Sequence, residues 1–340
     1  MIAKKLLDWF VELLACDATT GSEFSSLRHI EKSADLWLLN DSCARFWQRQ
    51  MVTDERFNLY GCYGVPKLIF CTHVDTVAPY ISPIWGCNDL VYGRGSCDAK
   101  GQVFTILLTV RRLLELGMRD FAVLLVVGEE QDSCGAKLAN TLIKDAENVL
   151  VLEPTGNRLI SAAKGSLRMK ISVEGKSAHS GYPASGEDAI QSWSDLNQCL
   201  LQHVWLCDPE LGNTTFNWGE LHSCNADNVV SAAVSAQLHW RTTFTSHKQL
   251  IPWFEQKIPD NIHWELVGRR EPFHFKILPG FETDVVAFGC DAPYLSNLGS
   301  AMLYGPGDIL VAHGPDERIS LREIETAVTN LVRMSQQLLN

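Results

Sequence analysis

The chain has 340 residues, 46% hydrophobic and 20% charged, which is the composition of a soluble globular protein with enough length for two domains. Its formal net charge of −11 and its pI near 5.4 argue against a nucleic-acid-binding surface. The eleven cysteines include no CxxC pair, and several lie within apolar runs, which is typical of reduced thiols in a cytoplasmic protein.

The N-terminal segment has two lysines, Lys4 and Lys5, followed by an apolar stretch that ends at Cys16, an order that lipoprotein signals share. Asp8 and Glu12 interrupt the apolar stretch, however, and Leu6 and Phe10 stand at helical spacing. The segment is therefore predicted to be an amphipathic helix. No part of the chain reaches the ~20 uninterrupted apolar residues that span a bilayer, so we expect no membrane-spanning helix.

Three short apolar runs each stop at residues that can bind metals or transfer protons. The runs are 68–71, 121–127 and 148–152, and helical patterns over 101–116 and 134–144 lie between them. The residues that follow the runs are His73 and Asp75, Glu129 and Glu130, and Glu153. Buried strands that alternate with helices predict a parallel sheet, and such sheets bind ligands at the carboxyl ends of their strands. One histidine and aspartate after a strand more often mark a solvated strand end, but three successive strands of this kind favour an active site.

The sequence pattern changes to strict alternation after Lys164. Apolar and polar residues alternate from Leu167 to Glu174 and again over 229–244, which predicts half-exposed antiparallel strands. The other elements expected in this region are helices at 188–204 and 248–258 and strands at 214–221 and 262–267. The resulting order, β-α-β-β-α-β, is that of a ferredoxin-like unit.

The C-terminal part returns to the first pattern. We expect a helix over 284–290, a strand over 301–304, and a long final helix that begins with a capping box at Ser320. The sequence therefore predicts an α/β catalytic domain with a mostly parallel sheet, formed by residues 1–164 and 273–340 and interrupted by a ferredoxin-like α+β domain at 165–272.

The residues expected at the sheet edge are mostly carboxylates: His73, Asp75, Asp98, Glu129, Glu130, Glu153 and His313. Carboxylates this close together would repel one another, and two divalent metal ions would remove that repulsion. Mixed histidine and carboxylate ligands suit zinc. A symmetric division gives each ion one histidine, one terminal carboxylate and a share of a bridging aspartate. Asp75 is then left to orient His73, and one glutamate of the 129–130 pair is left to act as general base.

Six segments together resemble a known family. They are THVDT, GRGSCDAKG, VVGEE, LEPT, KSAHSGYP and the late His313, and they span roughly residues 70 to 320. In this order they are similar to the motifs of the dinuclear zinc aminoacylase/carboxypeptidase family, which includes acetylornithine deacetylase and succinyl-diaminopimelate desuccinylase. The resemblance implies a zinc-exopeptidase-like catalytic domain, an inserted dimerisation or lid domain, and two divalent ions, zinc or cobalt.

The resemblance also implies a role for each matching residue. His73 and Glu153 would bind the first metal, Glu130 and His313 the second, and Asp98 would bridge the two ions. Glu129 would be the general base that acts on a metal-bound water, and Asp75 would steady His73. His179 would stabilise the oxyanion, and Asn228 and Arg241 would contact the α-carboxylate of the substrate.

Simpler interpretations exist for the residues of the inserted domain. Asn228 also fits a turn between strands, and Arg241 also fits a solvated arginine at a strand end. His179 on its own would be an ordinary surface histidine. Arg94 and Lys100 are interpreted as residues that stabilise their loop.

The substrate expected from these features is an N-acyl amino acid with a free carboxylate. A guanidinium such as that of Arg241 pairs with a carboxylate through two hydrogen bonds. Glu153, in place of an aspartate, resembles the deacylases and carboxypeptidases of the family more than its aminopeptidases, and the segments CDAKG and GEEQDSCGAK resemble its acetylornithine deacetylase branch. The resemblance therefore implies N2-acetylornithine deacetylation, a step of arginine biosynthesis, as the first candidate reaction. The alternatives are a metallo-carboxypeptidase, a desuccinylase, or a catalytically inactive binding protein, although no ligand or base is missing. We expect a cytoplasmic homodimer formed through the inserted domain, with no nucleic-acid or membrane partner.

Overall fold

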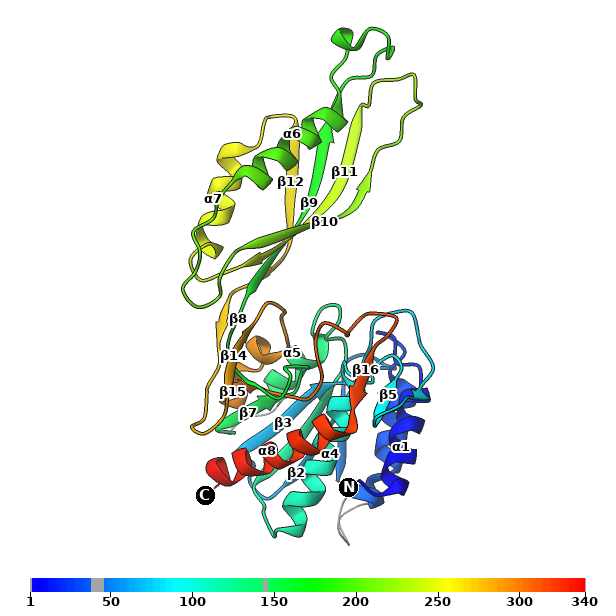
Figure 1. Cartoon of the computed structure of the whole chain (residues 1–340), viewed down its shortest axis with the longest axis vertical. Coiled ribbons are helices and arrows are strands. Elements are labelled where there is room, and N and C mark those ends of the chain that lie inside the picture. Colours follow the sequence, from blue (N-terminus) through cyan, green and yellow to red (C-terminus); the bar gives the residue numbers. More distant parts are fainter. Residues whose placement is uncertain (1, 38–45, 143–145, 340) are drawn as a thin grey trace. The chain divides into compact units, whose positions relative to one another are not determined.

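The computed structural model describes residues 2–37, 46–142 and 146–339. It divides into two compact units (Figure 1). The main unit comprises Met1–Ser161, Phe275–Asp284 and Cys290–Asn340, and the inserted unit comprises Ala162–His274 and Val285–Gly289. Within the described residues, no helix has the length and apolar character needed to cross a membrane.

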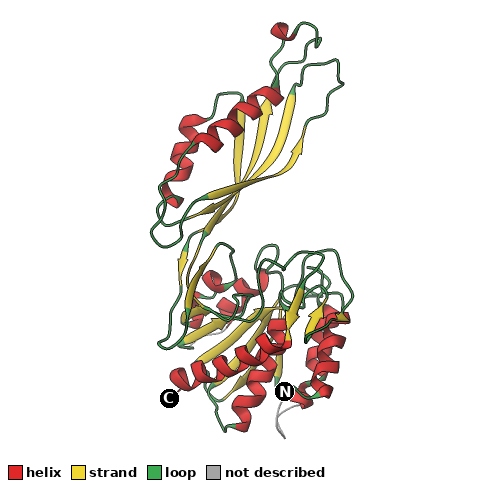
Figure 2. Ribbon diagram, viewed as in Figure 1, coloured by secondary structure: helices red, strands yellow, loops and turns green. Residues whose placement is uncertain are grey.

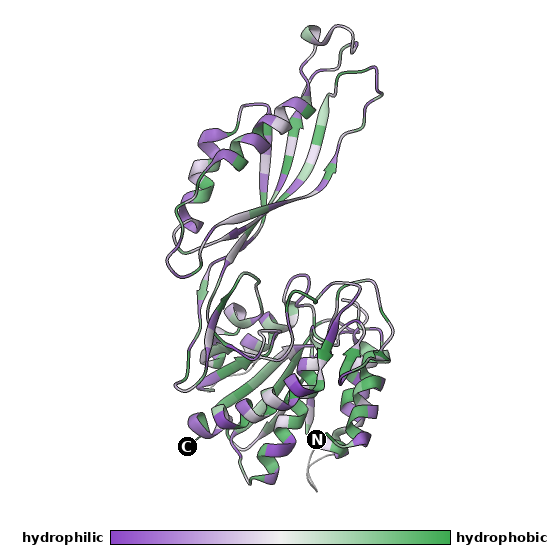
Figure 3. Ribbon diagram, in the orientation of Figure 1, coloured by the Kyte–Doolittle hydropathy of each residue, from purple (hydrophilic) through white to green (hydrophobic). Residues whose placement is uncertain are grey.

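The main unit is built on a mostly parallel sheet with the strand order β1-β2-β6-β3-β7-β15. Its strands are β1 (Trp47–Met51), β2 (Phe57–Tyr63), β3 (Leu68–His73), β6 (Phe121–Val126), β7 (Asn148–Val151) and β15 (Ser300–Leu303). Every residue of β3, β6 and β7 is buried, so both faces of the sheet are covered. These strands are among the most hydrophobic segments of the chain (Figure 3).

Helices cover this sheet as the alternating pattern predicts. They are α1 (Lys4–Ala15), α2 (Phe24–Lys32), α3 (Ala34–Trp37), α4 (Lys100–Glu115), α5 (Cys134–Leu142) and α8 (Leu321–Leu339). Helices α4 and α8 pack on each other and on β3, and α5 packs against β2 and β6. The predicted amphipathic first helix is confirmed, since its buried residues include Leu6 and Phe10.

Two small sheets complete the main unit and its connections. The first has the order β16-β5-β4 and consists of β4 (Ile84–Trp85), β5 (Leu90–Tyr92) and β16 (Arg318–Ser320). The second has the order β13-β8-β14 and consists of β8 (Leu159–Ala163), β13 (Phe273–His274) and β14 (Thr283–Val286).

The expected helix over 284–290 is wrong, because the segment starts in β14. Val285 and Val286 are β-branched and favour an extended backbone. The carbonyl of Val286 accepts a hydrogen bond from the backbone N–H of Lys164, at 3.0 Å. Pairing with a distant strand therefore overrides the local pattern, and residues 285–289 join the inserted unit.

The inserted unit has the predicted ferredoxin-like topology, with the sheet order β10-β11-β9-β12. Its elements are β9 (Gly165–Glu174), α6 (Ala189–Gln202), β10 (Thr215–His222), β11 (Ala233–Thr242), α7 (His247–Lys257) and β12 (Ile262–Arg270). All neighbouring strands are antiparallel. Both helices lie on one face of this sheet (Figure 2), over a core that contains Leu167, Leu238 and Trp240.

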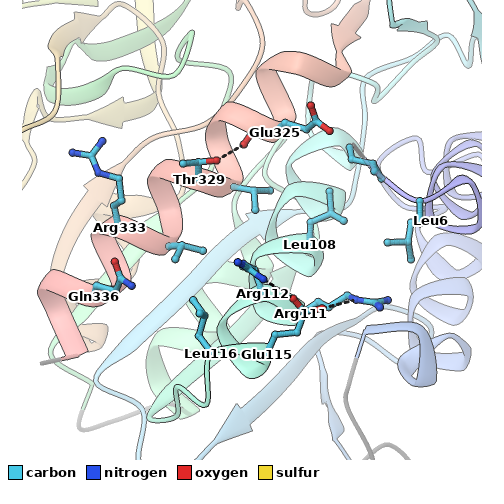
Figure 4. Close-up of a pocket in the computed structure, with 14 residues that line it drawn as sticks. Leu6, Leu108, Arg111, Arg112, Glu115, Leu116, Glu325, Thr329, Arg333 and Gln336 are labelled. Atoms are coloured by element: carbon cyan, nitrogen blue, oxygen red, sulfur yellow. Dashed lines mark hydrogen bonds and ion pairs between the residues drawn. The ribbon is translucent and has the colours of Figure 1, made fainter.

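The main unit also has a pocket of about 880 Å³ between α1, α4 and α8 (Figure 4). Its wall combines aliphatic side chains such as Leu108 with charged residues, among them Arg112 and Glu115, which pair with each other at 3.0 Å. None of its lining residues was predicted to bind a metal or a substrate.

Candidate metal centre

Four of the predicted residues, His73, Glu129, Glu130 and Glu153, lie at or directly after the ends of parallel strands. In register, His73 of β3 lies beside Val126 of β6, and Cys71 lies beside Val151 of β7. These strands therefore end at the same edge of the sheet, and the loops that carry Glu129, Glu130 and Glu153 begin there.

One half of the centre lies around His73. Its Nε2 is 3.0 Å from Oδ1 of Asp98 and 3.7 Å from Oε2 of Glu153. All three side chains are at least nine-tenths buried. His73 Nδ1 donates to the backbone carbonyl of Asp75 at 2.9 Å, and this directs the lone pair of a neutral imidazole, on Nε2, toward the two carboxylates.

The other half lies around His313. Its Nε2 is 3.1 Å from Oε1 of Glu130 and 3.3 Å from Oδ2 of Asp98. The two oxygens of Asp98 therefore face different histidines. A carboxylate that bridges two metal ions has this arrangement. One histidine and one glutamate lie on each side of Asp98.

The donor set fits divalent metal ions. Donor atoms of His73, Asp98 and Glu130 all lie within 4.8 Å of one another. Ligands around a tetrahedral ion with bonds of ~2.0–2.2 Å are separated by roughly 3.3–3.6 Å, close to the donor distances in both halves. Histidine nitrogen and carboxylate oxygen are the usual zinc ligands in catalytic sites.

The pKa values of the centre show that its carboxylates need positive charge among them. Burial raises the pKa of Glu153 to about 8, although His73 opposes this shift. Hydrogen bonds to Asp98 and Glu130 raise the pKa of His313 to about 10. Burial opposes ionisation of Asp98, but hydrogen bonds from His313 and His73 outweigh burial and lower its pKa. Protons on the histidines, or metal ions in their place, would supply this charge.

Glu129 lies in the same acidic environment. Burial raises the pKa of its carboxyl group well above the usual value, and the negative charge of Asp291 raises it further. Asp291 is itself buried, with 2% of its surface exposed. No local pattern predicted that Asp291 lies near the centre, because this residue follows a segment that was predicted as a helix.

Asp75 holds the loop that carries the two glutamates. Its Oδ1 accepts the backbone N–H groups of Gly128 and Glu129, at 2.9 and 3.2 Å, and its Oδ2 accepts that of Glu130, at 3.2 Å. Thr20 donates its hydroxyl to Oδ2 at 2.9 Å. The carboxylate is 3.5 Å from His73 Nδ1, so Asp75 contacts this histidine more closely through its backbone carbonyl than through its side chain.

A buried ion pair between Arg94 and Glu317 connects the loops of Asp98 and His313. Glu317 Oε1 accepts the backbone N–H groups of Gly95, Cys97 and Asp98, at 2.9 to 3.1 Å. Its Oε2 is 2.5 Å from Arg94 Nη1. Arg94 Nη2 donates to the carbonyl of His313 at 3.3 Å.

The loop-stabilising interpretation of Arg94 agrees with these contacts, whereas sequence reasoning missed Glu317. Its position four residues after His313, beside Asp316, was the available signal. Lys100 likewise stabilises its loop, since its Nζ donates to the carbonyl of Cys16.

The three residues of the inserted unit that were predicted to contact the substrate lie at two separate positions. Ser180 N donates to the carbonyl of Asn228 at 2.9 Å, and His179 forms a β-bridge with Val229, so the segments of His179 and Asn228 lie together. Arg241 lies at the other end of β11, opposite Ser166. Eight residues at ~3.4 Å each separate Ala233 from Arg241, which is roughly 27 Å. Asn228 and Arg241 of one unit therefore cannot both contact a single small carboxylate.

Comparisons with known proteins agree with the fold. The profile of Peptidase family M20/M25/M40 matches residues 69–337. A Peptidase M20 domain-containing protein of Schizosaccharomyces pombe is 33% identical and aligns with 97% of this chain and 84% of its own length. A protein of Talaromyces marneffei named "Probable carboxypeptidase" is also 33% identical, over 82% of this chain and 74% of its own length.

Solved structures share the fold at low identity. A tripeptidase from Staphylococcus aureus superposes with a TM-score of 0.80 at 20% identity, covering 100% of this chain and 99% of its own. The M20 family metallo-carboxypeptidase Sso-CP2 from Sulfolobus solfataricus has a TM-score of 0.71 at 14% identity, covering 97% of this chain and 98% of its own. From the family profile, the relatives and the histidine–carboxylate centre together, the chain belongs to the M20/M25/M40 peptidase family and is a hydrolase of its metallopeptidase type.

Proposed function

We propose that this protein is a two-metal amidohydrolase of carboxypeptidase type, which cleaves the amide bond beside a residue with a free α-carboxylate. The observation that carries the proposal is Asp98, whose two carboxylate oxygens face two different histidines, His73 and His313. The carboxypeptidase names of several relatives support the type of bond that is cleaved.

Two zinc ions would be held by residues of the main unit. His73 and Glu153 would bind one ion, Glu130 and His313 the other, and Asp98 both. Bound there, the ions would polarise the scissile carbonyl and lower the pKa of water. Cobalt is the alternative ion, because it accepts the same nitrogen and oxygen donors.

Glu129 would move the proton in this reaction. Its raised pKa suits a group that takes a proton from the attacking water and returns it to the departing amine. Asp75 would keep Glu129 in position, since it binds the backbone N–H groups of the loop from both of its oxygens. Asp75 is therefore a positioning residue in this proposal, and Glu129 is the catalytic base.

The inserted unit would complete the site from two copies of the chain. Arg241 would bind the substrate carboxylate, and His179 would stabilise the oxyanion. Because His179 and Asn228 lie at the far end of β11 from Arg241, all three reach one substrate only if different copies supply them. Strand β10 is an edge of its sheet and offers unpaired backbone groups to a second copy, which supports a homodimer formed through this unit. Sedimentation analysis tests this step, and a fully active monomer would contradict it.

The same machinery would also serve N2-acetylornithine deacetylation or desuccinylation, which differ only in the acyl group removed. All ten cysteines within the described residues are free thiols, as a cytoplasmic enzyme would have.

The test of the proposed function is metal analysis combined with hydrolysis of N-acetylornithine, N-acetylcitrulline, N-succinyl-diaminopimelate, acyl-glutamates and peptides with varied C-terminal residues. Two bound ions and metal-dependent release of the C-terminal amino acid are expected. A protein with two ions bound that hydrolyses none of these amides would refute the proposal.

A further inference from the structure

The loop that carries Glu129 and Glu130 is attached to β2 at both of its ends. The attachment is made by Asn58, whose Oδ1 accepts the backbone N–H of Val127 at 3.3 Å. Its Nδ2 donates to the carbonyl of Gly135 at 2.9 Å. Asn58 is buried, so water does not compete for these two hydrogen bonds.

The residue before β2, Arg56, lies against the start of the same loop. Antiparallel pairing sets Leu59 of β2 opposite Leu125 of β6, and this register, continued toward the N-terminal end of β2, places Arg56 opposite Gly128. The guanidinium lies close to this glycine, since a Cβ atom at position 128 would be 3.0 Å from Nη2 of Arg56. Nη1 of Arg56 also donates to Sγ of Cys134 at 3.7 Å. A side chain at position 128 would therefore displace Arg56.

Gly128 organises the backbone of the loop. Its carbonyl accepts the backbone N–H groups of Asp132 and Ser133, at 3.1 and 2.7 Å. Its own N–H donates to Oδ1 of Asp75 at 2.9 Å. Glu129 is the next residue, so a shift of Gly128 would also shift the carboxylate of Glu129.

Glu23, in the N-terminal segment, fixes Arg56 in this position. Its two carboxylate oxygens pair with Nε and Nη2 of Arg56, at 3.1 and 2.5 Å. The side chain of Glu23 is 1% exposed and that of Arg56 is 19% exposed, so the ion pair is largely shielded from water. Burial lowers the pKa of Arg56, but Glu23 outweighs burial and raises it, with smaller contributions from Cys134 and Asp75. The same segment reaches Asp75 directly, because Thr20 donates its hydroxyl to that carboxylate at 2.9 Å.

We propose that Arg56, fixed by Glu23, is a positioning residue for Glu129. It holds Gly128 from the side of β2, whereas Asp75 holds it from the side of β3. A group that transfers a proton must lie within hydrogen-bond reach of that proton, and a displacement of about 1 Å can lower turnover about 100-fold. This inference rests on the proposed function, from which it takes the role of Glu129 as base.

The test separates positioning from stability. R56Q leaves the carboxylate of Glu23 buried without its partner, so it should lower both the melting temperature and kcat. E23L/R56M replaces both charges by apolar side chains, a change that is often neutral for stability. We expect this double variant to melt within about 3 °C of the parent protein and to bind the same number of metal ions. Its KM should stay within about twofold, whereas its kcat should fall about 10- to 100-fold for the amide that the parent hydrolyses fastest.

R49Q is the matched control. Arg49 of β1 pairs with Glu31 of α2 through two hydrogen bonds, at 2.8 and 2.6 Å, and within the described residues neither side chain is hydrogen-bonded to the loop of Glu129. R49Q should therefore keep kcat within about twofold. Hydrogen exchange adds a measurement that does not depend on turnover. The amides of residues 128–130 should exchange at least about tenfold faster in E23L/R56M than in the parent, and at the parental rate in R49Q.

A double variant with parental kcat or with parental exchange rates would overturn the inference, as would the loss of a metal ion from that variant. Failure of the proposed function is a different result, in which the metal-loaded parent hydrolyses no amide. In that case the exchange rates decide the matter. Faster exchange of residues 128–130 in the double variant supports the positioning of this loop by Arg56, and unchanged rates overturn it.

Discussion

Replacing Glu317 by glutamine isolates the contribution of the buried ion pair that joins the loops of Asp98 and His313. The substitution keeps an oxygen for the backbone N–H groups of Gly95, Cys97 and Asp98 but removes the negative charge. It also turns an N–H donor toward Arg94 Nη1, which is already a donor. Arg94 has only 2% of its surface exposed, so its charge would remain buried and uncompensated.

The expected loss of stability is about 3–5 kcal/mol, the usual cost of removing one partner from a buried ion pair. That is a large part of the ~5–15 kcal/mol that stabilises a typical domain. Loss of the ion pair should also weaken metal binding, because the two loops that it joins carry Asp98 and His313. Loss of a residue that positions metal ligands typically weakens metal binding about 10- to 100-fold.

Urea unfolding with excess metal measures the first effect, and hydrogen exchange of β3 amides assigns it to the main unit. Competition with a coloured chelator measures the second. The neighbouring residue Asp316 is exposed, so D316N should stay within about 0.5 kcal/mol of the parent protein. An E317Q protein that loses less than about 1 kcal/mol and binds metal as the parent does would refute the reasoning.

Three further substitutions test other parts of the structure. E129Q should retain both metal ions, measured by mass spectrometry, and lose about 100- to 10,000-fold in kcat because it cannot accept a proton. D98N should lose metal from both halves of the centre, since each depends on one Asp98 oxygen, and chelators should then leave its melting temperature unchanged. D208N should destabilise the inserted unit by about 2 kcal/mol at pH 7. Burial opposes ionisation of Asp208, but hydrogen bonds from Leu211 and Thr245 outweigh burial and lower its pKa from 3.8 to about 2. The folded pKa lies below the unfolded one, so this stabilisation is present above pH ~4 and is lost as the pH falls to about 2.

Each of these expectations has a contrary outcome. Near-parental turnover of E129Q would remove Glu129 from the role of base. Two ions bound to D98N would show that Asp98 does not bridge the halves. A stability difference between D208N and the parent that stays constant from pH 6 to pH 2 would show that ionisation of Asp208 does not stabilise the fold.

Local sequence patterns were enough to predict the architecture and to propose most of the candidate ligands. The buried runs before His73, Glu129 and Glu153 are local patterns, and parallel strands that end at one edge bring their following residues together. The strict alternation around Leu167 likewise predicted the inserted sheet, because a half-exposed strand records its burial in every second residue.

Contacts between groups that are far apart in the sequence became visible in the folded chain. From the residues alone, either glutamate of the 129–130 pair could be the base, and the contact of Glu130 with His313 is the observation on which we propose Glu129 for that role. The pairing of Arg94 with Glu317 and the electrostatic effect of Asp291 on Glu129 have no local signature. The segment after Asp284 was predicted incorrectly for the same reason. Burial of a charge and pairing of a short strand depend on neighbours that arrive from distant parts of the chain, and local periodicity carries no information about those neighbours.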